Sequence, residues 1–345
     1  MRAMAVTEYG APLERIEVPE PQLRSGHALI EVLTCGVCFS DVKTSRGQMP
    51  FSGELELPHP PGHEICGQVL DTNPSGALEP GTKVVVYHVW PCRICSRCRA
   101  GEDNICVNPQ AWVGFTHPGG FQDRLLVPLD RVIAVPDSID PVHAAPMTCA
   151  LGTAYRATVT KGGIAAGSRA VVIGLGGVGI HALQIACAAG ALAVGLDTSQ
   201  PVIDEARDLG LDARRADDSD THEQLVAKSD EEGVDVVIDT VGHEDTIQQA
   251  DRLVRPGGRI VAVGYSPTTD FSLPSQRFVL EEVQLLGSRY VRLEELERAI
   301  MLVADGRVKI VIDGVKPLEA ANEALDALEA GDVVGRVVLD VGGVS

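Results

Sequence analysis

Four cysteines within fifteen residues constrain this chain more than any other feature of its sequence. Cys92, Cys95, Cys98 and Cys106 follow a C-x2-C-x2-C-x7-C pattern. Four thiolates from one short loop can close a tetrahedral shell around Zn²⁺, and such a site is structural because no position stays open. Disulfides fit less well, since the chain is long and its nine cysteines are an odd number. We therefore expect a zinc loop and a reducing compartment, the cytoplasm.

Length and charge narrow the class of protein further. A chain of 345 residues is too long for one small core, which predicts two domains. The formal net charge of −19 argues against nucleic-acid partners and against an anionic membrane surface. The first ten residues contain no apolar segment of the kind that secretion signals carry. We expect a protein with no membrane or nucleic-acid partner.

The arrangement of apolar runs changes along the chain. Residues 1 to about 150 contain short apolar runs separated by proline and glycine, which predict strands at 28–33, 65–70, 83–87, 121–127 and 132–135. The following region alternates strands and helices, which predicts a parallel sheet with right-handed crossovers. Its expected strands are 171–174, 193–197, 234–239 and 259–264, and its expected helices are 178–189 and 201–209. The tail adds helices at 293–305 and 318–330 and a strand at 333–340.

Residues 170–196 contain no charged side chain and are numerous enough to span a bilayer. Their six glycines instead divide the stretch into strand, turn, helix and strand, so we expect a buried βαβ unit. Within it, Gly174-Leu-Gly176-Gly177-Val178-Gly179 follows a strand and opens a helix. Such glycines permit a tight turn, close approach to a pyrophosphate and close helix packing, and the helix N-terminus favours phosphate. The sequence therefore predicts a dinucleotide site.

Asp197 indicates which dinucleotide binds. It ends the next predicted strand, eighteen residues past Gly179. A carboxylate at this place accepts hydrogen bonds from the ribose 2′-hydroxyl and repels a 2′-phosphate. No arginine or lysine directly follows Asp197. We therefore expect NAD rather than NADP.

A second metal site can be formed by residues that lie far apart in the sequence. Cys38, His63 and Cys149 supply three ligands and leave a fourth position open, which is typical of catalytic zinc. Spacing alone allows a closed Cys3His site of Cys35, Cys38, His63 and Cys66 instead. A third interpretation makes Cys35, Cys66 and Cys187 ordinary buried thiols.

Taken in order, these motifs and Gly335-Arg336-Val337-Val338 resemble the medium-chain zinc alcohol dehydrogenases over essentially the whole chain. The resemblance implies an α/β protein with a mostly-β GroES-like catalytic domain and a Rossmann domain that binds NAD. The catalytic domain comprises residues 1–150 and 290–345, and the Rossmann domain comprises residues 151–289. The resemblance also implies two zinc ions per subunit, one on the four-cysteine loop and a catalytic one on Cys38, His63 and Cys149.

The same resemblance implies roles for further residues. Glu64 approaches the metal transiently, Asp41 orients His63, Ser40 takes the proton from the alcohol, and Arg336 contacts the cofactor pyrophosphate. The nicotinamide pocket is expected from Thr153, Val178, Val241 and Val263, and the substrate pocket from Ser40, His88, Trp90, Trp112 and Phe115. Three residues depart from the family pattern: Phe39 replaces a basic residue, Lys43 replaces a histidine of the proton relay, and Arg93 replaces a glycine.

The implied function is reversible hydride transfer between a primary or secondary alcohol and NAD⁺, giving an aldehyde or ketone. Two alternatives remain open. One is a polyol or sugar dehydrogenase of the same fold, against which Cys149 argues because such enzymes often have a carboxylate there. The other is a zinc-stabilised NAD(H)-binding sensor without catalysis. By resemblance, the subunits are expected to form a homotetramer or a dimer.

Overall fold

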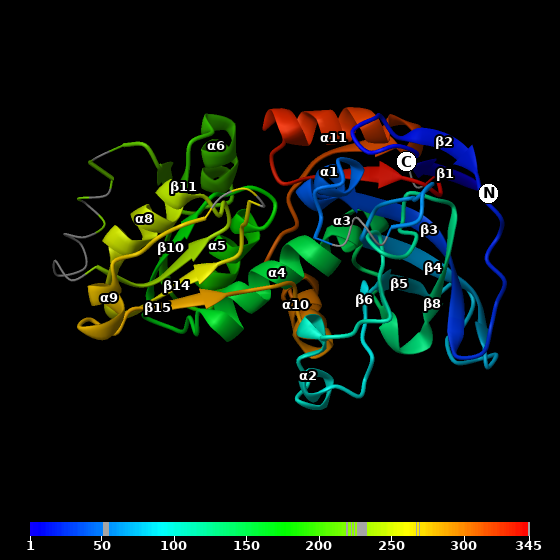
Figure 1. Cartoon of the computed structure of the whole chain (residues 1–345), viewed down its shortest axis with the longest axis horizontal. Helices are drawn as coiled ribbons and strands as arrows, with labels where there is room; N and C mark the ends of the chain where they lie inside the picture. The colour runs from blue at the N-terminus through cyan, green and yellow to red at the C-terminus, as the bar shows by residue number, and fades with distance from the viewer. Residues whose placement is uncertain are drawn as a thin grey trace. The chain divides into compact units, whose positions relative to one another are not determined.

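The computed structural model describes every residue except 51–54, 219, 222, 224, 226–232, 267, 269 and 344–345. The chain divides into two compact units, which Figure 1 draws and which are described separately here. The first unit contains Met1–Cys149, Arg292–Ala304 and Ile312–Ser345, and the second contains Ala150–Val291 and Asp305–Val311. The chain therefore leaves the first unit twice and returns to it twice.

The first unit is built on a seven-stranded sheet with the order β16-β17-β3-β4-β5-β9 and with β8 also paired to β3. Its strands are β3 His27–Val37, β4 Glu64–Asn73, β5 Lys83–Val86, β8 Arg124–Pro128, β9 Val132–Ala134, β16 Ile312–Pro317 and β17 Arg336–Asp340. Two small sheets pair β1 Arg2–Ala5 with β2 Glu14–Glu17, and β6 Val89–Trp90 with β7 Ala111–Trp112. Its helices are α1 Phe39–Ser45, α2 Ser96–Arg99, α3 Pro141–Pro146, α10 Leu293–Ala304 and α11 Ala321–Ala330.

Strand β3 organises this unit. Along one edge it pairs first with β8 and then with β17, and along the other it pairs with β4. Its first residues alternate between buried and half-buried, as expected for a sheet with one covered face, whereas its last four residues are all buried. The strand therefore delivers the following residue, Cys38, into the interior.

The second unit contains a parallel sheet with the order β12-β11-β10-β13-β14-β15. Its strands are β10 Arg169–Ile173, β11 Leu192–Asp197, β12 Ala213–Arg215, β13 Val234–Asp239, β14 Val254–Ala262 and β15 Gln284–Gly287. Its helices include α4 Gly152–Tyr155, α5 Gly179–Ala188, α6 Gln200–Asp208, α8 Glu244–Leu253 and α9 Ser275–Val279. The strand order reverses direction at β10, the point where open α/β sheets bind ligands.

The uncharged stretch 170–196 forms β10, α5 and β11, as predicted. Its first eight helical residues, Gly179–Ala186, are all buried, which explains why that helix has no polar face. None of the helices formed by the described residues combines the length and apolar character that a membrane crossing requires. The predicted pairing of a mostly-β GroES-like fold with a Rossmann sheet is confirmed.

Several predicted boundaries were wrong for local reasons. The strand expected at 333–340 begins only at Arg336, because Gly335 has a φ of 81° and interrupts the extended chain. The strand expected at 259–264 begins at Val254, and its register shifts across the Pro-Gly-Gly segment that the pattern takes for a loop. The strand expected at 121–127 is Arg124–Pro128. The helix expected at 318–330 divides into a 3-10 turn, Leu318–Ala320, and α11.

Residues 305–311 lie with the second unit and not with the first, where the predicted domain division places them. Val308, Ile310 and Val311 are buried there. Gln184 of α5 bonds both backbone groups of Lys309, at 3.0 and 2.8 Å. This short segment is tied to a helix that lies more than a hundred residues earlier in the sequence, a relation that local pattern does not reveal.

Candidate metal and cofactor sites

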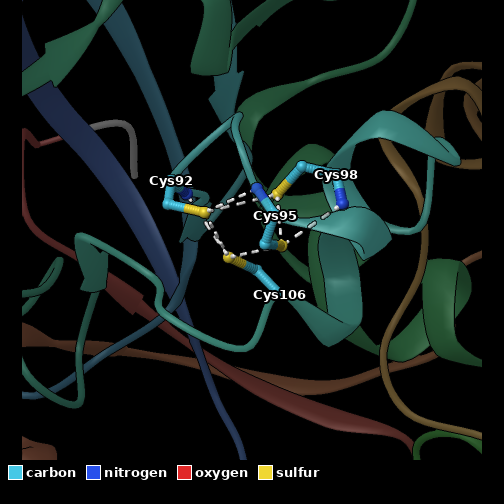
Figure 2. Close-up of side chains that lie close together, drawn as sticks. All are labelled: Cys92, Cys95, Cys98 and Cys106. Atoms are coloured by element: carbon cyan, nitrogen blue, oxygen red, sulfur yellow. Dashed lines mark hydrogen bonds between the residues drawn. The ribbon is translucent and has the colours of Figure 1, made fainter.

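The four cysteines of the loop face one another across a small volume (Figure 2). Their sulfur atoms are 3.4 to 3.9 Å apart in four pairs, and all four lie within 4.8 Å of one another. Four sulfurs at the zinc–sulfur bond length form a tetrahedron with edges of about 3.8 Å. The spacing and the donor chemistry therefore fit a structural zinc ion.

Backbone N–H groups already stabilise these sulfurs. The amide of Cys95 donates to the sulfur of Cys92, and the amide of Cys98 donates to the sulfur of Cys95, at 3.4 and 3.5 Å. Amides of Cys98 and Val107 lower the pKa of Cys95 to about 6. Arg93 adopts a φ of 63°, so the residue that replaces the family's glycine keeps a left-handed turn in spite of its side chain.

The second group of potential ligands is assembled from three distant segments of the first unit. Cys38 is the N-cap of α1, His63 directly precedes β4, and Cys149 lies in a single π-helical turn, Met147–Leu151. The ligand atoms of these residues and of Glu64 lie within 4.8 Å of one another. Cys38, His63 and Glu64 are buried and Cys149 is half-buried. Two thiols, an imidazole and an adjacent carboxylate form a donor set that fits catalytic zinc.

Asp41 holds this group together from the first turn of α1. One carboxylate oxygen accepts from the Cys38 amide at 2.9 Å, and the other lies 3.2 Å from Nδ1 of His63. With Nδ1 engaged in this way, Nε2 of His63 is left to bind a metal. Burial lowers the pKa of His63, but the charges and hydrogen bonds of Asp41 and Cys38 outweigh burial and raise the pKa well above its usual value.

Arg336 is the buried cation of the cluster. Its Nε donates to both oxygens of Glu64, at 3.0 and 3.3 Å, and its Nη2 lies 3.6 Å from the sulfur of Cys38. Burial raises the pKa of Glu64 to about 7, although the charge of Arg336 acts in the opposite direction. Sequence reasoning missed this ion pair. The only available signal is that each residue lies at the start of an apolar strand.

Cys35 and Cys66 belong to neither group of potential ligands found among the described residues. Both are fully buried, and burial raises the pKa of Cys66 to about 12. A thiol of that kind stays protonated and unreactive. The structure therefore favours the interpretation of these two residues as buried apolar thiols over a closed Cys3His site.

The structure brings most of the predicted substrate residues to one place. His88 and Phe115 have ring centroids 5.2 and 4.6 Å from that of His63, and Trp112 lies 6.2 Å from His88. Ser40 Oγ is 3.8 Å from the sulfur of Cys38. The ring of Trp90 packs 4.5 Å from that of His117 and belongs to the hydrophobic core, and its role in the substrate pocket stays a prediction.

Two departures from the family pattern lie on α1. Phe39 is 47% exposed, and because its side chain is uncharged it adds no positive charge to this helix N-terminus. The Lys43 ammonium lies 5.8 Å from the centre of the Phe39 ring, and burial lowers its pKa. Lys43 therefore packs over an aromatic ring of its own helix, one turn from Ser40.

The glycine loop of the second unit links β10 to α5. Gly174 has a φ of 81°, and a Cβ there would collide with Thr240 and Val241. A Cβ on Gly179 would collide with the carbonyl of Gly174, whereas one on Gly176 would meet nothing within 4 Å. The backbone at Gly176 is therefore open to a ligand, as an approaching pyrophosphate requires.

Asp197 lies at the carboxyl end of β11, beside this loop. Its two carboxylate oxygens accept from the amides of Leu175 and Ser199 at 2.7 and 2.8 Å. Of the four residues expected around the nicotinamide, Thr153 is buried in α4, Val178 and Val263 are half-buried, and Val241 is 37% exposed, all in the same unit. Their role in cofactor binding stays a prediction.

Comparisons with known proteins agree with this geometry. The family described as "Alcohol dehydrogenase GroES-like domain" matches residues 24–137, and that described as "Zinc-binding dehydrogenase" matches residues 177–305. An alcohol dehydrogenase of Geobacillus stearothermophilus is 32% identical over 98% of both chains. A D-arabinose 1-dehydrogenase (NADP(+)) of Saccharolobus solfataricus is 33% identical over 98% of this chain and 97% of its own length.

A solved structure described as an NAD-dependent alcohol dehydrogenase superposes with a TM-score of 0.92, at 28% identity, covering 99% of this chain and all of the other. The chain therefore belongs to the medium-chain zinc-dependent alcohol dehydrogenase family. The resemblance stated from the motifs is confirmed.

Proposed function

We propose that this protein is an NAD-dependent alcohol dehydrogenase that interconverts a primary or secondary alcohol and its aldehyde or ketone. One observation carries the proposal. Cys38, His63 and Cys149, distant in sequence, direct their ligand atoms to one buried point in a chain of this family. A purely structural metal would not need such a site, because the four-cysteine loop already supplies one.

The chain's own residues divide the work at this site. Cys38, His63 and Cys149 would hold a zinc ion, which when bound lowers the pKa of an alcohol hydroxyl. Asp41 orients His63 through Nδ1, at 3.2 Å. Arg336 neutralises Glu64 and keeps its carboxylate engaged until ligands exchange. The aromatic rings next to His63 exclude water from the reacting hydroxyl.

Ser40 is the proposed proton acceptor. It lies in the first turn of α1 with its hydroxyl beside the Cys38 sulfur. A hydroxyl both accepts and donates a hydrogen bond, so it can take a proton from the substrate and pass one on. Lys43 follows three residues later on the same helix, at the position where the family often has a histidine of the proton relay.

The glycine loop and Asp197 form the proposed cofactor site. The open backbone at Gly176 and the N-terminus of α5 receive the pyrophosphate, and Asp197 receives the ribose hydroxyls. The bound nicotinamide supplies the hydride acceptor. Arg336 remains a candidate pyrophosphate ligand, although its guanidinium is engaged by Glu64 in this structure.

One relative keeps a second function under consideration. A sugar dehydrogenase, as the name of the 33% identical relative states, needs the same hydride chemistry and additional hydroxyl-binding groups. The two rings nearest to His63, those of Phe115 and His88, offer few such groups. We therefore favour an apolar or aromatic alcohol.

A panel of alcohols, sugars, aldehydes and ketones, monitored by NADH absorbance, tests the proposal. We expect turnover with simple alcohols and little with aldoses. Ser40→Ala should lower kcat by about a hundredfold while zinc content stays unchanged, as expected for loss of a general acid–base group. NADH binding without turnover on any substrate would instead support a sensor.

Assembly and location complete the proposal. We propose a cytoplasmic homotetramer, with a dimer as the alternative. All nine cysteines lie among the described residues and none of them forms a disulfide, which supports a reducing compartment. Light scattering after size-exclusion chromatography measures the oligomer, and a monomer at micromolar concentration would contradict this part.

A further inference from the structure

The strand next to Asp197 carries an arginine at the same level. β12 pairs in parallel with β11, and the register places Arg215 opposite Asp197 and Arg214 opposite Leu196. The amide of Ala216 donates to the backbone carbonyl of Asp197 at 2.9 Å, which extends this pairing past the end of β12. Arg215 and Asp197 therefore lie side by side at the carboxyl edge of the parallel sheet, the edge at which α/β sheets bind nucleotides.

In this structure the guanidinium of Arg215 binds the carboxylate of Asp217, two residues later in the chain. Its Nε and Nη2 donate to the two oxygens of Asp217 at 2.8 and 2.6 Å. The side chains of Arg215 and Asp217 are 41% and 54% exposed, so solvent and ligands reach this pair. The hydrogen bond with Asp217 raises the pKa of the Arg215 guanidinium, and the charge of Asp197 adds to the effect. The Arg215 guanidinium is thus paired with Asp217 and is also within the electrostatic influence of Asp197.

Asp197, by contrast, is held in place by the backbone. The amides of Leu175 and Ser199 bind its two oxygens, so its negative charge stays next to the glycine loop. A ribose 2′-phosphate carries about two negative charges and three acceptor oxygens. It would be repelled by Asp197, while a guanidinium in its usual forked geometry would bind it bidentately.

We propose that Arg215 is a second determinant of cofactor selectivity, a 2′-phosphate-binding arginine that Asp197 and Asp217 keep unavailable in the native chain. This inference rests on the proposed ribose-binding role of Asp197. It gives the preference for NAD a specific cause. The native chain discriminates against a 2′-phosphate by local negative charge, although a suitable cation lies on the neighbouring strand.

Binding of two small nucleotides tests the inference without catalysis. Adenosine 2′,5′-bisphosphate and 5′-AMP differ only in the 2′-phosphate, and calorimetry measures the affinity of the full-length protein for each. Asp197→Asn removes the charge and keeps an oxygen that can accept one of the two amide hydrogens. We expect it to raise the bisphosphate-to-AMP affinity ratio by about tenfold, the value of one charge-assisted hydrogen bond.

The arginine is tested in that background. Adding Arg215→Ala to Asp197→Asn should return the affinity ratio to near its native value, whereas adding Asp217→Asn should raise it further. Arg214→Ala is the matched control, because Arg214 lies on the same strand and also pairs with a carboxylate two residues away, Asp212, at 2.6 Å. It should leave the ratio of the Asp197→Asn protein unchanged.

The outcomes separate the two ideas. In the first outcome, Asp197→Asn leaves the bisphosphate-to-AMP affinity ratio unchanged, and the double variant Asp197→Asn, Asp217→Asn gains no affinity for the bisphosphate. The ribose-binding role of Asp197 then fails, and the inference fails with it. If Asp197→Asn raises the ratio and Arg215→Ala does not reverse the gain, Asp197 keeps its role and Arg215 loses the one proposed. An equal effect of Arg214→Ala and Arg215→Ala would reduce the result to general positive charge and would also overturn the proposal.

Discussion

The four-cysteine loop and the buried Cys38 cluster place similar ligands in very different surroundings. The loop takes all its ligands from one short segment, and three of the four are only half-buried. The other cluster takes its ligands from three segments, buries most of them and surrounds them with Asp41 and Arg336. The loop site needs only its own short segment to be folded, whereas the Cys38 cluster forms only when the sheet has brought its three segments together. We infer that one group serves stability and the other chemistry.

The sharpest way to break this comparison is to remove one ligand of the buried cluster. Cys38→Ser should lower kcat/KM by about a thousandfold or more, since a metal contributes several kcal/mol to the stabilisation of developing charge. The fold and the zinc of the loop should persist. Elemental analysis should find one zinc ion fewer per chain, and full activity in a one-zinc protein would contradict the proposed division.

Removing a ligand of the loop should have the opposite profile. Cys98→Ser should lower the free energy of unfolding by about 3 to 4 kcal/mol, because metal binding to such a loop is part of its folding energy. At temperatures where the variant is folded, kcat/KM should stay within about threefold of the native value. Thermal unfolding and initial rates on the same preparation measure both. A large loss of activity in a fully folded sample would show that the two clusters are coupled.

Burial of a histidine in the first unit also predicts a dependence of stability on pH. Desolvation lowers the pKa of His59 from 6.5 to about 4 in the folded chain. Between these two pH values the unfolded chain binds a proton that the folded chain does not, so stability falls as pH falls, by up to about 3 kcal/mol. His59→Phe should remove this part of the acid sensitivity. Denaturant unfolding of both proteins at neutral pH and near pH 4 measures the loss of unfolding free energy between the two pH values. An equal loss in the native protein and in His59→Phe would refute this cause.

The smallest expected effect concerns the residue that orients a ligand. Asp41→Asn keeps the shape of the side chain and removes the charge next to His63. Changes at such supporting positions cost about 10- to 100-fold in metal affinity or activity. We expect weaker retention of the catalytic zinc against a chelator, with the zinc of the loop unaffected. Unchanged retention would mean that the 3.2 Å contact with Nδ1 of His63 contributes little.

Local pattern was enough for much of the fold. The glycine loop, the uncharged βαβ stretch and the cysteine spacing each depend on neighbours in sequence, and the structure has all three where they were expected. Boundaries failed where a conformation depends on a single glycine, as at Gly335, or on a distant core, as at residues 305–311. A periodic pattern contains no information about either.

The metal and cofactor sites, like the fold, were predictable from sequence only in part. Sequence alone determined which thiols can share an ion in the loop, because a chain of fifteen residues can hardly keep them apart. It left two arrangements open for Cys38 and His63, and family resemblance was needed to choose Cys149. Only the tertiary structure paired Arg336 with Glu64 and set Arg215 level with Asp197. Those contacts join residues brought together by strand order and burial, which long-range packing decides and local spacing does not.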